Sequence, residues 1–304
     1  MLKRKALKRI YLTTLVLFIT LIIFSLDHLK EDKNNNLIET EYVSNLNTSH
    51  IYLLNEDNYL VKVDFLLTKD NIKDNIKMII NELSINNKKY LPLKGIIPSN
   101  TKLNNIDLND NTLTIDFSND LLKVNKHLEE KVIESIVYSL LELKEIDNVK
   151  ISIDGKQLTK LEKNNKTLPV LLDNSFGINK TYDINKINDI EKVVIYYVFN
   201  EKEKDYYVPV TKYINSQDSK VKIIIDSLKG NFSSNTNLRS YLNSNINIDF
   251  KIDDDILTFT FDSLNEDSLE QITYSLASSI FDSMDIEKVV FEVNSKIVDV
   301  KTKN

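Results

Sequence analysis

The sequence predicts an α+β protein in which an N-terminal transmembrane helix precedes two similar domains. Each domain is expected to be a two-layer α/β sandwich of order ββαββαββ, with both helices on one face of the sheet. Three observations lead to this prediction. The chain of 304 residues is 42% hydrophobic and 28% charged, which is a globular composition. An apolar run without charged residues lies near its start, and the remainder aligns with itself.

The first element is a membrane anchor. Residues 1–9 carry five basic groups and no acid, and they form a predicted cytoplasmic tail. Residues 10–26, from Ile10 to Leu26, are apolar on all sides and match a short membrane span. No small-x-small cleavage site follows, so an uncleaved signal anchor is expected, with the later domains outside the cytoplasm. Residues 27–49 are polar and read as a stalk.

Charge and composition exclude several classes of function. Subtracting the five N-terminal basic residues from the total of 39 leaves 34 basic against 45 acidic residues, a net charge of −11. An acidic exterior excludes nucleic acid as a partner. The chain has no cysteine, which excludes disulfides, thiolate metal sites, a cysteine nucleophile and a lipidated N-terminal cysteine.

The two domains are predicted from an internal repeat at residues 50–162 and 191–301, joined by a linker at 163–190. Each copy opens with two strands, 51–56 and 59–63 in the first copy and 196–201 and 206–210 in the second. The helices at 75–83 and 220–228 then place apolar residues at spacings of 3, 4 and 7, which line one helix face.

A second pair of strands follows in each copy. The strands at 102–108 and 246–252 precede "NTLTIDFSNDLL" (111–122) and "DILTFTFDSLN" (255–265), which alternate apolar and polar residues as a half-buried strand does. The turns "NDN" and "DDD" favour hairpins. A second helix (132–143 or 272–284) and two short strands (146–158 or 286–298) close each copy.

This ordered pattern resembles the GerMN domain of sporulation and spore germination proteins. The residues that carry the resemblance in the first copy are "LPLKGIIPSNTKL", with Gly95 and Pro98, "NTLTIDFSNDLL", and "IDG" (153–155). The second copy diverges, since it lacks the proline and Ser295 replaces the glycine. The resemblance implies an extracytoplasmic scaffold in the space between mother cell and forespore membranes, protein partners in the channel complex that joins the two compartments, and self-association.

Family members are often lipoproteins, which a chain without cysteine cannot be. The anchor is therefore expected to be the helix at 10–26.

No enzyme is predicted, and no catalytic, cofactor or metal site. The four glycines are isolated, which argues against a phosphate-binding loop, and Gly230 reads as a helix C-cap. The three histidines lack ligand spacing. They are His28, His50 and His127. Two alternative sites with acidic residues are less well supported by the sequence than ordinary turn and strand roles. The first is a calcium loop at Asp107, Asn109 and Asn111, which correspond to Asp253, Asp254 and Asp255 in the second copy. The second is a hydrolase pair of Asp116 and Asp154, which are replaced by Thr260 and Asn294 in the second copy.

Tyrosines gather at the start of each copy, at positions 52, 59, 196, 197, 206 and 207. Aromatic rows on strands grip glycans or protein partners, and they also pair inside sheets. The structural role is favoured, and peptidoglycan binding stays open as the competing function.

Overall fold

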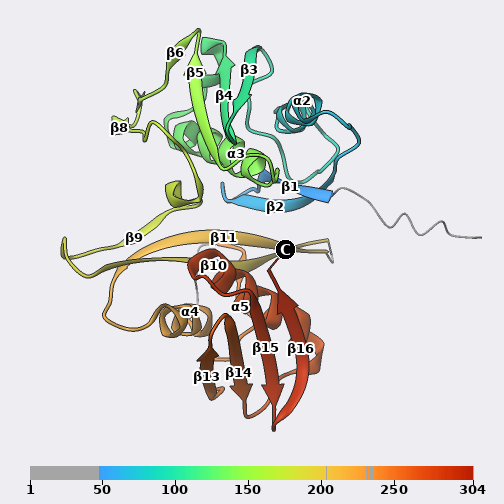
Figure 1. Ribbon diagram of the computed structural model, residues 1–304, viewed down its shortest axis with the longest axis vertical. Helices are drawn as coiled ribbons and strands as arrows, with labels where there is room; N and C mark the ends of the chain where they lie inside the picture. Colours follow the sequence, from blue (N-terminus) through green and yellow to red (C-terminus); the bar gives the residue numbers. More distant parts are fainter. Residues whose placement is uncertain (1–47, 203, 231, 233–235, 304) are drawn as a thin grey trace, which may run out of the picture. The chain divides into compact units, whose positions relative to one another are not determined.

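The computed structural model describes residues 48–202, 204–230, 232 and 236–303. Both predicted repeats are present, in the predicted order (Figure 1). The first repeat comprises β1 (Thr48–Leu54), β2 (Leu60–Leu66), α2 (Ile72–Glu82), β3 (Leu103–Asn109), β4 (Thr112–Phe117), α3 (Glu129–Leu141), β5 (Asn148–Ile153) and β6 (Lys156–Gln157). The second comprises β10 (Ile190–Glu201), β11 (Lys204–Asn215), α4 (Lys220–Lys229), β12 (Leu238–Arg239), β13 (Ile248–Asp253), β14 (Ile256–Phe261), α5 (Leu269–Ser283), β15 (Lys288–Val293) and β16 (Lys296–Thr302).

Each repeat contains a four-stranded sheet of the same topology. The orders are β3-β4-β5-β6 and β13-β14-β15-β16, and the central pair is parallel in both sheets. Parallel neighbours need a crossover, which α3 and α5 provide. The stretches that the sequence repeats, β4 and β14, are therefore the same strand of the same sheet.

The opening hairpins depart from the two-layer prediction. Strands β1 and β2, and strands β10 and β11, do not join the four-stranded sheets of their own repeats. They join each other instead, in a shared sheet of order β1-β2-β11-β10-β12. The α3 helix contacts both β1 and β5, and α5 contacts both β10 and β16. Each of these helices thus lies between a hairpin and a four-stranded sheet. The apolar pattern of the sequence shows that a helix is buried, but not that it packs against two separate sheets.

The amphipathic helices bury the predicted faces. Ile76 and Ile79 in α2 are fully buried, as are the equivalent Val221 and Ile224 in α4. Asn71 and Ser219 cap the helix N-termini with side-chain oxygens that accept backbone N–H bonds. Gly230 is the C-cap of α4, as predicted, and its N–H donates to the backbone carbonyl oxygen of Asp226.

The loop with the family-like glycine closes the end of α2. The N–H groups of Ile96 and Ile97 both donate to the carbonyl oxygen of Leu83. A Cβ on Gly95 would lie 2.3 Å from the carbonyl oxygens of Leu83 and Ser84. Only glycine allows the backbone to pass this close.

Two boundaries differ from the sequence prediction. Strand β1 begins at Thr48, inside the segment predicted as stalk, because its register with β2 extends two residues further. The linker is also more structured than a plain connector. It contains β8 (Lys166–Thr167), which pairs with β7 (Lys160–Leu161) just before the linker, and β9 (Thr181–Asp183), which pairs with β11.

The predicted anchor at residues 10–26 lies outside the described residues. Within the described part of the chain, no helix combines the length and apolar character needed to cross a membrane.

Candidate functional site between the repeats

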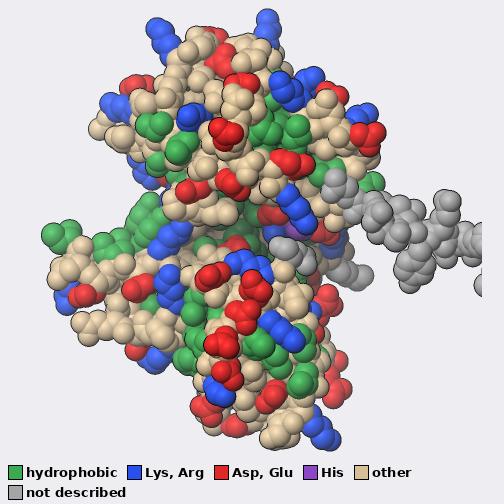
Figure 2. Space-filling model, viewed as in Figure 1, with side chains coloured by type: hydrophobic (Ala, Val, Ile, Leu, Met, Phe, Trp, Pro, Cys, Tyr) green, Lys and Arg blue, Asp and Glu red, His purple; other side chains and the backbone are tan. Residues whose placement is uncertain are grey.

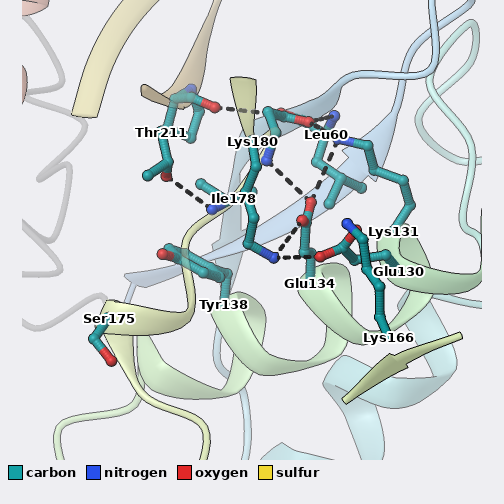
Figure 3. Close-up of polar contacts among 12 residues, drawn as sticks. Leu60, Glu130, Lys131, Glu134, Tyr138, Lys166, Ser175, Ile178, Lys180 and Thr211 are labelled. Carbon is teal, nitrogen blue, oxygen red and sulfur yellow. Dashed lines mark hydrogen bonds and ion pairs between the residues drawn. The ribbon is translucent and has the colours of Figure 1, made fainter. Parts of the chain in front are cut away.

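The linker enters the interior of the protein at Ile178 and Asn179, which are 0% and 1% exposed. The N–H of Ile178 donates to the Thr211 hydroxyl at 2.9 Å, and the N–H of Thr211 donates back to the Ile178 carbonyl (Figure 3). Gly177 precedes this segment with a φ of +79°, a conformation that favours glycine. The linker is therefore built into the fold rather than running over its surface.

The Asn179 amide joins both repeats. Its Oδ1 accepts from the N–H of Leu60 at 2.9 Å and from the Lys131 ammonium at 2.7 Å. Its Nδ2 donates to the carbonyl oxygens of Leu60 and Pro209, each at 2.8 Å. Leu60 begins β2 of the first repeat and Pro209 lies in β11 of the second. All the hydrogen-bonding capacity of one buried amide is thus used to hold two hairpins together.

Charged side chains form ion pairs next to this segment of the linker, and Figure 3 shows Lys180 pointing toward Glu130 and Glu134. The Lys180 ammonium lies 2.9 Å from Glu134 and 2.8 Å from Glu130, both on α3, and the Asn179 N–H donates to Glu134 at 3.0 Å. Burial alone lowers the pKa of Lys180, but attraction to the two carboxylates outweighs it and the pKa is raised. Burial lowers the pKa of Lys131. Removing one partner of such a network leaves a buried charge unpaired, so the network favours one arrangement of linker and repeat.

A cavity of about 690 Å³ lies next to the shared sheet and is lined by both repeats. Each repeat contributes a tyrosine hydrogen-bonded to a carboxylate at the end of its second long helix. The Tyr52 hydroxyl donates to Glu142 at 2.7 Å, and the Tyr196 hydroxyl donates to Asp282 at 2.6 Å. The backbone N–H of each tyrosine donates to an equivalent helix serine, Ser139 or Ser279, at 2.9 Å.

The two carboxylates differ in their surroundings. Glu142 also contacts His50 Nδ1 at 2.7 Å and the Lys62 ammonium at 3.1 Å. Burial by itself would raise the pKa of Glu142, but the hydrogen bonds and charges of His50 and Lys62 outweigh burial and lower the pKa to about 2. Burial instead raises the pKa of Asp282. The hydrogen bond from Tyr196 lowers the pKa, but by less than burial raises it.

The tyrosines of the predicted row are mostly structural. Tyr52, Tyr196 and Tyr197 are 1–2% exposed, and burial raises the pKa of all three. Tyr207 is half-buried and stacks on Tyr274 with ring centroids 3.7 Å apart. The predicted structural role is confirmed for the three buried tyrosines.

The acidic alternatives are accounted for by turns. Asp116 accepts from the N–H of Gly155 at 2.9 Å, and Asp154 accepts from the N–H of Asn119 at 3.3 Å. Both carboxylates therefore fix the backbone around the β5–β6 turn.

In the turn weighed as a calcium loop, the Asp107 carboxylate accepts from the Asn109 side chain, and the Asn111 side chain donates to Asp147. The described residues hold no group of three or more potential acidic or histidine metal ligands. Of the histidines, His50 pairs with Glu142, His127 is exposed and His28 lies outside the described residues.

Sequence reasoning missed Asn179, Glu142 and Asp282. The last two have a signal that could have found them, since they fall at equivalent positions of the two aligned helices. The equivalence of their partners Tyr52 and Tyr196 is visible only in the structure, because the sequence alignment pairs Tyr52 with Tyr197. Asn179 has no counterpart in a repeat, since it lies in the linker.

Known proteins match this architecture. The family model "Germane: Sporulation and spore germination" matches residues 50–159. The spore germination protein GerM of Bacillus subtilis (strain 168) is 24% identical over 280 residues, which cover 88% of this chain and 76% of that protein. The solved structure titled as the tandem GerMN domains of the sporulation protein GerM from Bacillus subtilis superposes with a TM-score of 0.72 at 23% identity. It covers 82% of this chain, and the match spans 91% of its own length.

These findings confirm the resemblance that the sequence indicates for both repeats. The first repeat matches the family model directly, and the superposition over 82% of the chain shows the tandem fold. The chain is therefore similar to GerM over most of its length: its first repeat matches the Germane family model, and the two repeats share the fold of the tandem GerMN domains.

Proposed function

We propose that this chain is a non-enzymatic, membrane-anchored assembly protein of the sporulation envelope, with its repeats outside the cytoplasm. The observation that carries the proposal is the buried junction at Asn179, whose amide bonds one hairpin of each repeat. Two domains tied in this way present two related surfaces in a constant relation, which is what a scaffold needs. The similarity to a spore germination protein of Bacillus subtilis supplies the context of spore germination.

The mechanism in this proposal is geometric. The apolar segment at 10–26 would hold the protein in one membrane, and the polar stalk would set how far the repeats reach. The repeats would then bind protein partners of the channel between mother cell and forespore, and further copies of the chain. The net charge of −11 outside the membrane segment keeps the domains away from anionic lipid and nucleic acid.

Peptidoglycan binding is the second candidate, and a specific surface supports it. Tyr182 in β9 is 60% exposed and stacks on Tyr213 in β11, with ring centroids 5.1 Å apart and planes 9° apart. Ile184, Ile187 and Ile190, close to Tyr182 in the sequence, are exposed as well. Figure 2 shows hydrophobic side chains gathered at the left of the view, on the side where Figure 1 shows β9. Paired, exposed aromatic rings can stack on sugar faces.

Localisation in the species of origin tests the first candidate. A fluorescent fusion of the full-length protein is followed in starving cells. Enrichment at the engulfing membranes is the expected result, and even labelling of the envelope in growing and starving cells alike would contradict a sporulation role.

Sedimentation with purified cell wall tests the second candidate. The full-length protein in detergent is mixed with wall material and pelleted, alongside Tyr182→Ala and a control, Tyr206→Ala. Tyr206 is a half-buried tyrosine beside Phe199 and away from the Tyr182–Tyr213 pair. Wall binding that is lost only in Tyr182→Ala would establish the glycan candidate, and protein that stays in the supernatant would remove it.

A further inference from the structure

The two tyrosine–carboxylate pairs of the cavity lie at equivalent positions in the two repeats, but only the carboxylate of the first repeat has cationic partners. In the first repeat, the residue across the hairpin from Tyr52 is Lys62. In the second repeat, the residue across from Tyr196 is Pro209. The cation that pairs with Glu142 in the first repeat is therefore replaced by an uncharged side chain in the second.

The other cationic partner is also missing. His50 lies two residues before Tyr52 and contacts Glu142 at 2.7 Å, whereas Val194 lies two residues before Tyr196. Among the described residues, no lysine, arginine or histidine forms an ion pair with Asp282. Lys62 and Lys303 act on it only through Coulomb attraction at longer range.

Asp282 is nevertheless reachable. Its side chain is exposed to the cavity, while the protein around it raises its pKa, and the Tyr196 hydroxyl is its one hydrogen-bond donor in the described part of the chain. The walls next to it include the ring of Tyr274, the ring of Phe281 and the methyl group of Ala277. A carboxylate with a free oxygen, beside aromatic and apolar walls, suits a cation carried on an alkyl chain.

We propose that the cavity between the repeats binds a primary alkylammonium group, which takes at Asp282 the place that the Lys62 ammonium takes at Glu142. The ammonium donates hydrogen bonds to Asp282, and its alkyl chain lies against Tyr274 and Phe281. This site goes beyond the scaffold role: it would make the shape or stability of the junction respond to a ligand. The ammonium belongs either to a free small amine or to an amino-bearing side chain of a peptide.

Ligand-observed NMR on the full-length protein in detergent tests the proposal, with n-butylamine as the probe at pH 7 and butan-1-ol as the neutral control. We expect saturation transfer to the amine and none to the alcohol. Asp282→Asn keeps the size of the side chain and an oxygen for Tyr196, and should weaken amine binding about tenfold or more through loss of the charge. Asp64→Asn, which removes an exposed carboxylate of the same cavity, should leave binding unchanged.

A second variant supplies the missing cation from a side chain of the protein itself. Pro209→Lys reproduces the arrangement of Lys62, so it should abolish amine binding and raise the melting temperature. Equal binding of amine and alcohol, or equal binding to wild type and Asp282→Asn, would overturn the proposal whatever Pro209→Lys does. A probe of N-acetyl-lysine amide distinguishes the sources: tighter binding than n-butylamine indicates a peptide, and weaker binding indicates a free amine.

Discussion

Replacing Asn179 with alanine should lower the free energy of unfolding and weaken the coupling between the two repeats. The buried amide makes four hydrogen bonds, of 2.7 to 2.9 Å, to Leu60, Lys131 and Pro209. At about 1 kcal/mol for each bond left without its partner, Asn179→Ala should cost about 4 kcal/mol of unfolding free energy. Asn179 also has a φ of 49°, which asparagine tolerates better than alanine and which adds about 1 kcal/mol.

A matched control isolates the hydrogen bonds from the backbone effect. Asn165 has a φ of 55° and is exposed, and its side chain makes no hydrogen bond to another described residue. Asn165→Ala should therefore cost only the backbone contribution of about 1 kcal/mol.

Urea unfolding of the full-length protein, followed by far-UV circular dichroism, measures both variants against wild type. We expect one transition for wild type and Asn165→Ala, and an earlier, broadened or split transition for Asn179→Ala. If the two variants lie within about 1 kcal/mol of each other, the amide does not hold the repeats together and the reasoning fails.

Two further predictions follow from single residues. The pKa of Glu142 is lowered from 4.5 to about 2, so its ionised form stabilises the fold above pH 4.5 and that contribution is lost as the pH falls from about 4.5 towards 2. Urea midpoints at pH 6 and pH 3 should show that wild type loses about 2 kcal/mol more than Glu142→Gln, and equal losses would contradict the pairing with Lys62 and His50. Gly95→Ala should cost more than about 3 kcal/mol in the same assay, because its Cβ would lie 2.3 Å from two carbonyl oxygens. Gly230→Ala, whose Cβ would lie 3.4 Å from the nearest atom, should cost about 0.5 kcal/mol, and similar costs for both glycines would refute the close contact at Gly95.

The repeat made most of the fold predictable. Alternation in β4 and β14 and the helical spacing of Ile76 and Ile79 are local patterns, and local patterns survive in the structure because each buries one face. The sharing of one sheet by the two hairpins was not predictable in this way. A strand pattern states which face is buried, and it does not state which neighbouring edge the strand joins.

The candidate site was less predictable than the fold. The alignment of residues 59–63 with 206–210 already places Lys62 and Pro209 at the same position, but only the structure shows that each lies opposite a tyrosine across its hairpin. Asn179 sits in a segment that composition identifies as a connector, where asparagine is ordinarily a turn residue. Its role depends on three segments that are distant in the sequence and meet around it. Such contacts are a property of the tertiary structure and leave no local pattern in the sequence.

The rigidity of the junction is the claim on which the scaffold proposal rests, and a distance measurement tests it most directly. The chain has no cysteine, so spin labels can be placed at two chosen positions alone. Asp107→Cys in β3 and Lys251→Cys in β13 occupy equivalent, exposed sites, one in each repeat. Pulsed electron paramagnetic resonance on the doubly labelled full-length protein should give one narrow distance distribution, which broadens when Asn179→Ala is added. A broad or multimodal distribution in the otherwise wild-type protein would contradict a fixed relation between the repeats.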